Sequence, residues 1–356
     1  MAHSGNSFEL QGPSGSTPRT PRPATLQREK EWSMKLQNFK TRDRAIIKAF
    51  LEFRKQNIVS QLKRLNLSWS NWGFGMEPLE TSAKRLENNK IRYIELHGNL
   101  YGKDLGYRSP EVNQILRSHG IKVGGICGMV WPESEFSSSS PLVRQHCIDY
   151  FRRHIDFCSE VGGQYILFTP GAVGRPNKYD DNEFCRAAET IRIIGDDFLK
   201  AKIRCGIEPV RKDEVSLCHT FAEAKALIDE IDHPGVKHIA GDVFHMLLGE
   251  EHIGETILKY GELLTNLHLA DSNRRALGTG MLDIDIVIMA LYLVGFNNEQ
   301  CFCSPEPLGA GSNPYDQMNG RPDPRMLDEM VRQTASYFYE REEEVLNAGE
   351  MDLLES

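Results

Sequence analysis

Short apolar runs alternate with amphipathic stretches along most of the chain. The runs favour strands, and the stretches between them carry apolar residues at the helical spacings of three, four and seven. Strands that alternate with helices are typical of a parallel sheet covered by helices. We expect eight strands, at residues 67–74, 91–97, 122–127, 165–169, 203–208, 238–242, 264–268 and 301–306.

The amphipathic stretches predict the helices that connect these strands. One strand, one helix and two loops take about 30 residues, which is close to the observed repeat. An alternation of this length predicts an α/β protein, a (β/α)8 TIM barrel whose strand ends meet at one mouth. The expected helices lie at residues 82–89, 110–118, 141–161, 181–201, 221–231, 254–263, 284–294 and 325–346.

The predicted barrel occupies residues 66–346, and three further segments flank it. Residues 1–30 are rich in Ser, Pro, Gly and Thr, a composition that predicts a disordered N-terminal tail. Residues 31–65 are expected to form an extra N-terminal helical extension, with a helical pattern from Arg42 to Leu65. A barrel does not need this helix for closure, so packing beside the barrel and contact with another subunit both remain open. Residues 347–356 are expected to form a C-terminal tail.

Composition excludes several classes of protein. The chain has 356 residues and a formal net charge of −8, which gives no reason to expect nucleic-acid binding. No stretch approaches the roughly 18 apolar residues of a membrane span. The N-terminus lacks an apolar signal core. The eight cysteines are scattered without a CxxC pair, so we expect reduced thiols in a cytoplasmic protein.

Four successive predicted strands end on side chains that bind metals well. They are Glu208, Asp242, His268 and Glu306. Because the ends of barrel strands converge, these side chains are expected to form one divalent-metal site. Three carboxylates and one imidazole suit Mn²⁺ first, with Mg²⁺ or Co²⁺ as alternatives, better than they suit a structural Zn²⁺.

The same four residues suggest a chemistry. A bound metal can polarise a carbonyl group and stabilise an enolate. Proton abstraction beside that carbonyl needs carboxylates on both sides of the carbon. Glu208 and Glu306 follow strands three positions apart around the barrel, so they can approach a ligand from different sides.

Other polar residues lie close to these strand ends. Glu214 and Arg274 follow Glu208 and His268 at short distance, and His245 follows Asp242. A lone histidine after a strand often caps or packs, and a lone arginine is often solvated, so structural roles stay open beside substrate binding. The same two readings apply to two residues at the end of the second strand, His97 and Asn99. Two long loops, residues 131–140 and 309–324, either shape a pocket or are solvated decoration.

The sequence around these residues resembles the xylose-isomerase-like barrels, in particular the ketose 3-epimerases that act on free sugars such as tagatose, psicose and ribulose. The resemblance covers about residues 66–308. Its most specific parts are Gly206-Ile207-Glu208-Pro209, Asp242-Val243-Phe244-His245, His268 to Arg274 followed by Gly278-Thr279-Gly280, and Pro305-Glu306-Pro307.

The resemblance implies a mechanism for each candidate residue. Glu208, Asp242, His268 and Glu306 would hold the metal, and Glu208 and Glu306 would double as the acid/base pair. Glu214, His245 and Arg274 fall on positions that bind sugar hydroxyls in those epimerases. The reaction would be deprotonation beside a ketone, a metal-stabilised cis-enediolate, and reprotonation from the opposite face.

The chain departs from those epimerases in its N-terminal helix, its tail and the segment at residues 309–324. Similar barrels occur in inosose dehydratases, hydroxypyruvate isomerases and the catalytic subunit of bacterial C-glycoside deglycosidases, which cleaves a 3-oxo-glycoside by elimination with a small second subunit. A lyase of that kind is therefore our alternative function. The expected partners are a sugar substrate and either a second copy of the chain or a small subunit.

Two other classes fit the residues less well. Barrels that repair abasic sites use more histidine ligands around zinc and present a basic groove, whereas this chain offers one histidine in the metal set and a negative net charge. A scaffold or binding subunit does not need two carboxylates positioned around one ligand.

Overall fold

The computed structural model describes residues 38–98, 106–308 and 323–355. Arg42–Ser356 forms one compact unit. Met1–Thr41 forms the other, of which residues 38–41 are described. The predicted tail at residues 1–30, the candidate residue Asn99 and most of the loop at 309–324 lie outside the described residues.

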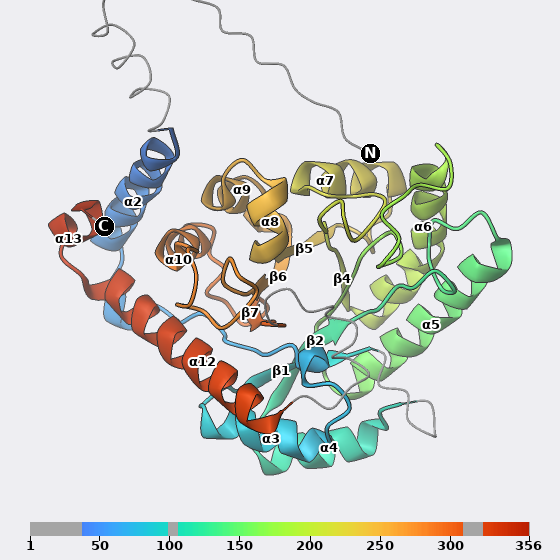
Figure 1. Cartoon of the computed structure of the whole chain (residues 1–356), viewed down its shortest axis with the longest axis horizontal. Coiled ribbons are helices and arrows are strands. Elements are labelled where there is room, and N and C mark those ends of the chain that lie inside the picture. Colours follow the sequence, from blue (N-terminus) through green and yellow to red (C-terminus); the bar gives the residue numbers. More distant parts are fainter. Residues whose placement is uncertain (1–37, 99–105, 309–322, 356) are drawn as a thin grey trace, which may run out of the picture. The chain divides into compact units, whose positions relative to one another are not determined.

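Within the described residues, seven parallel strands pair in chain order around the core of the larger unit (Figure 1). Each of the first six strands is hydrogen-bonded to the strand that follows it in the sequence, with helices outside. This arrangement confirms the predicted TIM barrel. The strands are β1 (Tyr93–His97), β2 (Lys122–Cys127), β3 (Tyr165–Phe168), β4 (Arg204–Ile207), β5 (His238–Asp242), β6 (Leu264–Leu269) and β7 (Phe302–Pro305).

The first predicted strand, at residues 67–74, is only partly extended. Leu67 and Ser70 each form one isolated parallel bridge, to Cys303 and Glu95 respectively, so this segment lies between β7 and β1. The next residues form the short 3-10 helix η2 (Asn71–Phe74). The prediction of a strand over residues 67–74 was therefore wrong for its second half, residues 71–74. The Asn71 side chain instead accepts a hydrogen bond from the backbone N of His97 at 2.8 Å, which ties η2 to the end of β1.

Helices connect the strands on the outside of the sheet (Figure 1). Proline in the first turn of α4 and of α5 fits the position where a missing N–H costs nothing. The helices are α2 (Asn38–Gln56), α3 (Leu79–Asn88), α4 (Ser109–Ser118), α5 (Pro141–Glu160), α6 (Glu183–Ala201), α7 (Phe221–Ile231), α8 (Val243–Gly249), α9 (Ile253–Tyr260), α10 (Ile284–Leu293), α12 (Pro324–Asn347) and α13 (Glu350–Glu355), with 3-10 turns η1 (Val59–Gln61) and η3 (Gly261–Leu263).

Helix α2 ends at Gln56, before the predicted end at Leu65. Its apolar stripe is buried, and the ring of Phe50 lies 6.2 Å from that of Tyr292 on α10. The stripe that predicted this helix is therefore covered within the chain itself, which favours packing beside the barrel. Ile58, which continues the stripe in the sequence, is exposed because the helix has already ended.

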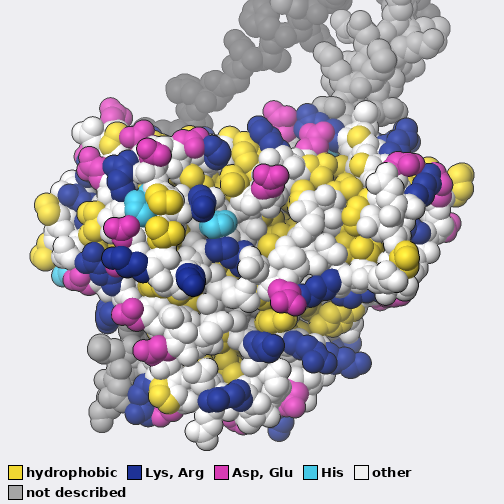
Figure 2. All heavy atoms as spheres, turned by 180° about the vertical axis from the view of Figure 1, so that it is seen from behind, with side chains coloured by type: hydrophobic (Ala, Val, Ile, Leu, Met, Phe, Trp, Pro, Cys, Tyr) yellow, Lys and Arg dark blue, Asp and Glu magenta, His cyan; other side chains and the backbone are white. Residues whose placement is uncertain are grey.

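The surface of the face in Figure 2 carries acidic and basic side chains interspersed, with apolar side chains between them. Mixed signs of this kind are typical of a solvated surface. Among the described residues, every helix is too short or too polar to cross a membrane.

A tyrosine fills the barrel interior beneath the mouth. Tyr165 on β3 is fully buried, and its ring lies 5.8 Å from that of Phe302 on β7. A Cβ atom at Gly125 on β2 would come within 2.5 Å of the Tyr165 ring. Glycine is therefore required at this position, because it leaves the space that allows the tyrosine to cross the barrel.

Candidate metal centre and active site

The four predicted metal ligands lie together at the C-terminal end of the barrel. Glu208 directly follows β4, Asp242 ends β5, His268 belongs to β6 and Glu306 directly follows β7. All four side chains are buried. Ligand atoms of Asp242, His268 and Glu306 lie within 4.8 Å of one another, as do those of Glu208, Asp242 and His245. The strand pattern thus predicted which residues would meet.

The imidazole of His268 faces two different environments. Its Nδ1 lies 3.6 Å from Glu208 Oε1 and 3.5 Å from Glu306 Oε2 and has no hydrogen-bond partner. Its Nε2 lies 2.8 Å from Glu95 Oε1. Buried polar atoms are normally satisfied, so an orphaned ring nitrogen among carboxylates fits a role as a metal ligand. The donor set of three carboxylates and one imidazole suits the divalent metals named above.

The pKa shifts of Glu208 and His268 also favour a bound cation. Burial raises the pKa of the Glu208 carboxyl to about 7, and the charges of Asp242 and Glu306 add to that rise, while His268 opposes it. Burial alone would lower the pKa of His268, but the charges of Glu306 and Glu95 hold it well above its ordinary value. Carboxylates crowded in this way favour an added positive charge, and a divalent cation would keep Glu208 ionised.

Helix α8, which the sequence pattern did not predict, orients two of the site residues. Asp242 is its N-cap, and Oδ1 accepts a hydrogen bond from the backbone N of Phe244 at 2.8 Å. The other oxygen, Oδ2, lies 3.4 Å from Nε2 of His245, one turn along the helix. The cap thus fixes one carboxylate oxygen and leaves the other facing the cluster.

Glu306 is held by two residues of the segment at 67–74, which lies between β7 and β1. The indole Nε1 of Trp72 donates a hydrogen bond to Glu306 Oε1, and the Ser70 hydroxyl donates to the same oxygen at 3.1 Å. These bonds leave Oε2 directed toward His268. Neither Trp72 nor Ser70 was a candidate from the sequence, because their segment was interpreted as an ordinary strand.

Arg274 and Glu214 form a buried pair at the pocket. Arg274 Nη1 donates to Glu214 Oε1 at 3.2 Å, and Arg211 Nε donates to the same oxygen at 2.6 Å. The Arg274 guanidinium also lies 4.7 Å from the centre of the Phe244 ring. The backbone of Arg274 has φ +57°, a left-handed conformation within the loop that follows β6. The loop aims this side chain into the pocket, next to Glu214.

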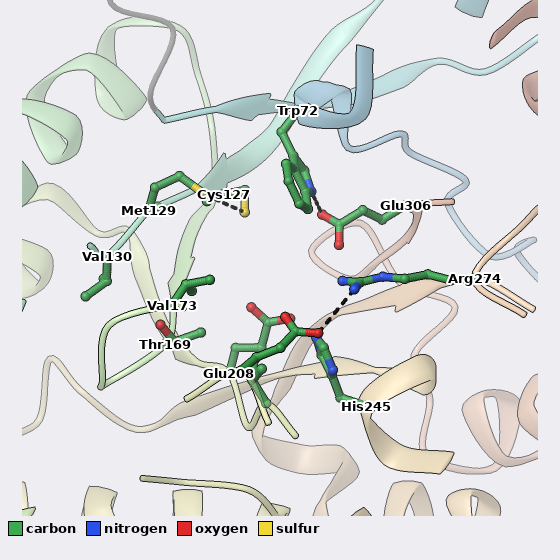
Figure 3. A pocket seen from close by; sticks show the side chains of 13 residues that line it. Trp72, Cys127, Met129, Val130, Thr169, Val173, Glu208, His245, Arg274 and Glu306 are labelled. Carbon is green, nitrogen blue, oxygen red and sulfur yellow. Dashed lines mark hydrogen bonds and ion pairs between the residues drawn. The ribbon is translucent and has the colours of Figure 1, made fainter. Parts of the chain in front are cut away.

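The pocket has one polar and one apolar side (Figure 3). Met129, Val130 and Val173 lie across it from Glu306 and Arg274. A pocket with an apolar wall and a few convergent polar groups is typical of a small-molecule site. The remaining lining residues are Trp72, Cys127, Gly128, Thr169, Glu208, Val210, Glu214 and His245.

His97, the candidate at the end of the second predicted strand, does not line this pocket. His97 ends β1, but it is absent from the pocket lining, and the edge of its ring faces Trp72 at 6.3 Å. Burial lowers the pKa of His97 to about 3, so the ring is neutral at ordinary pH. Packing behind Trp72 therefore fits His97 better than substrate contact. Asn99 lies outside the described residues.

Sequence reasoning missed Glu95, which contacts a predicted ligand directly. This residue lies in the middle of β1 and is 0% exposed. The signal was visible as a charged residue within the apolar run Tyr93-Ile94-Glu95-Leu96, because a buried charge needs a partner. We did not predict Glu95 as a site residue, because we considered only the residues at the ends of the strands.

Comparisons with known proteins identify the family of the barrel. Residues 83–317 match the family model for the xylose isomerase-like TIM barrel. A ketose 3-epimerase of Arthrobacter globiformis is 25% identical over 191 residues, which cover 52% of this chain and 65% of that protein, slightly less than two thirds. A 3-dehydro-D-guloside 4-epimerase of Escherichia coli K12 is 25% identical over 208 residues, 54% of this chain and 78% of that protein.

Solved structures show the same fold. The structure of an L-ribulose 3-epimerase superposes with a TM-score of 0.69 at 17% identity, covering 79% of this chain and 96% of that one. The family model matches more than half of the chain, from the helix before β1 to beyond β7. The chain therefore belongs to the xylose isomerase-like TIM barrel family.

Proposed function

We propose that the protein is a divalent-metal-dependent sugar epimerase or isomerase that moves a proton at the carbon beside the carbonyl of a keto-sugar. The observation that carries the proposal is that Glu208 and Glu306, which both line the pocket, approach the same orphaned nitrogen of the buried His268. Relatives named as ketose and dehydro-guloside epimerases support the same class of reaction.

The residues that would hold the metal are Glu208, Asp242, His268 through Nδ1, and Glu306. Mn²⁺ is the first choice for this ligand set, with Mg²⁺ or Co²⁺ as alternatives. When bound, the cation would polarise the substrate carbonyl and stabilise the negative charge that develops on its oxygen.

The two glutamates would carry the proton. One carboxylate removes the proton from the carbon beside the carbonyl, which leaves the substrate as an enediolate. The other, as a carboxylic acid, returns a proton to the opposite face of that carbon, so that its configuration is inverted. The hydrogen bonds from Trp72 and Ser70 to Glu306 Oε1 would fix the orientation of this carboxylate during the transfer.

Arg274, Glu214 and His245 would bind the substrate hydroxyls. Glu214 pairs with both Arg274 at 3.2 Å and Arg211 at 2.6 Å, and Arg211 also lies 3.2 Å from Asp213, so the two positive charges in this part of the pocket are balanced by two carboxylates. A neutral sugar suits such a site better than a sugar phosphate does, because a phosphate would compete with Glu214 for the guanidinium.

Deuterium exchange followed by NMR tests this function. The Mn²⁺-loaded protein is incubated in D₂O with psicose, tagatose or ribulose, and we expect deuterium at the carbon beside the ketone together with a new epimer. Glu208→Gln and Glu306→Gln should each reduce turnover by about 10²–10⁴-fold, because a general acid or base is lost. Glu329→Gln, an exposed glutamate on α12, is the matched control and should keep full turnover. Near-normal turnover in either site variant would overturn the assignment.

A second candidate function uses the same proton abstraction on a 3-oxo-glycoside. The apolar side of the pocket could accommodate an aglycone, and the Escherichia coli relative is named for a dehydro-guloside substrate. Elimination would then release the aglycone, as in a lyase that works with a small second subunit. Exchange with 3-oxo-glucosides alone would assign the oxo-glycoside class, and release of the aglycone would assign the lyase.

A further inference from the structure

A fully buried carboxylate lies beneath the candidate metal site. Glu95 is 0% exposed and belongs to β1, while the predicted ligands follow or belong to β4 to β7. Placing a charge in the barrel interior costs several kcal/mol unless it is well hydrogen-bonded, so its contacts indicate what it does.

Both oxygens of Glu95 have partners. Oε1 lies 2.8 Å from Nε2 of His268. Oε2 accepts a hydrogen bond from the Tyr165 hydroxyl at 2.6 Å and a longer one from Asn266 Nδ2 at 3.4 Å. Because these donors occupy both oxygens, Glu95 is less available as a ligand itself, although its oxygens lie near those of Glu306.

We propose that Glu95 is a positioning residue that fixes the tautomer and the ring orientation of His268. A carboxylate accepts hydrogen bonds and donates none, so Nε2 of His268 carries the hydrogen and Nδ1 of the neutral ring keeps its lone pair. Nδ1 faces the oxygens of Glu208 and Glu306, so in the neutral ring its lone pair would meet a cation held between them. The inference rests on the proposed function, because it assumes that His268 binds a metal.

The contacts of Glu95 also explain why the surrounding residues are needed. Tyr165 reaches Glu95 across the barrel only because Gly125 leaves space for its ring. The Tyr165 hydroxyl lies 3.4 Å from Ser304 Oγ, which connects it to β7. Residues of β2, β3 and β7 thus hold the carboxylate in line with the imidazole.

Metal binding without substrate tests this role. The full chain is stripped of metal, and the Kd for Mn²⁺ is measured by calorimetry for wild type, Glu95→Asp and Glu95→Gln. We expect the Kd to rise by about 10–100-fold in Glu95→Gln, the usual effect of removing such a partner, and by less in Glu95→Asp, which keeps the charge on a shorter side chain. Glu342→Gln, at another buried glutamate that accepts from a tyrosine hydroxyl, is the matched control and should keep the wild-type Kd.

The tautomer provides a readout that general destabilisation does not move. Two-bond ¹H–¹⁵N spectra of the Mg²⁺-loaded protein should show His268 protonated at Nε2 in wild type and a mixture of tautomers in Glu95→Gln. A folded Glu95→Gln with a Kd within twofold of wild type and an unchanged tautomer overturns the inference. If Glu95→Gln does not fold, Glu95→Asp decides by the same criterion. Wild type that binds no Mn²⁺ would instead overturn the proposed metal-dependent function.

Discussion

Arg175 connects its own loop to the loop of Glu135 and to the start of α6 at Glu183, and we predict that Arg175→Met destabilises the protein strongly. Its Nη2 donates to Glu135 Oε2 at 2.8 Å and its Nη1 donates to Glu183 Oε1 at 2.7 Å. The two carboxylate side chains are 0% and 1% exposed, and the arginine side chain is 10% exposed. The guanidinium also stacks at 4.0 Å over Tyr179.

The magnitude follows from this burial. Removing one partner of a buried ion pair leaves an uncompensated charge and costs about 3–5 kcal/mol. Methionine replaces the apolar stem of the side chain but donates no hydrogen bond, so both carboxylates lose their cation. At an unfolding entropy of about 2.1 cal/mol/K per residue, a loss of that size lowers the Tm of a chain this long by roughly 4–8 °C.

The assay is unfolding by urea and by heat, followed by circular dichroism. Arg332→Met is the matched control, because Arg332 pairs with Glu329 at 2.6 Å while both side chains remain 58% and 62% exposed. Exposed pairs contribute about 0–1 kcal/mol, so the control should barely shift. Adding Glu135→Gln and Glu183→Gln to Arg175→Met should recover part of the loss. A loss in Arg175→Met no larger than that of the control would refute the reasoning.

Two further predictions concern binding and pH. Arg274→Ala should raise KM for the keto-sugar with kcat nearly unchanged, because it removes ground-state binding, and steady-state kinetics that show a collapsed kcat at unchanged KM would assign it another role. The hydrogen bonds that His119 donates to Glu87 and Glu80 raise the pKa of this half-buried imidazole above its ordinary value. The stability it adds, less than about 1 kcal/mol, is present below the unfolded pKa and is lost as pH rises through the folded one. His119→Gln should therefore lower Tm at pH 5.5 but not at pH 9, and equal losses in calorimetry at both values would contradict this.

The pattern of apolar runs predicted most of the fold because each strand is buried on both faces. Strands β2 and β5 have the predicted bounds, and so does α7. The pattern failed where a tertiary contact replaced the local preference. Residues 71–74 alternate like a strand, but the Asn71 side chain caps β1 and the chain turns into η2.

Helix α8 was missed for a different reason. It begins at Val243, directly after Asp242, so no loop residues separate it from β5. Its seven residues are too few to establish a helical period beside the apolar strand. Asp242 therefore ends a strand, caps a helix and belongs to the candidate metal site, and the sequence alone revealed the first and the third of these roles.

Part of the candidate site was predictable from the positions of strand ends, and part of it became visible only from the contacts in the structure. The ligand-type residues at strand ends were predictable, because all parallel strands of a barrel end at one mouth. The orientation of these ligands depends on buried residues beneath the mouth, such as Glu95. A search for buried charges in the sequence would not have distinguished Glu95 from the other buried charged residues. Arg85, Glu135, Glu183 and Glu342 are also buried, and each pairs with groups away from the predicted ligands. Among these, Glu95 alone accepts from the imidazole of a predicted ligand, at 2.8 Å. Burial thus identifies a charge that must be satisfied, whereas the identity of its partner separates a structural ion pair from a residue that orients the site.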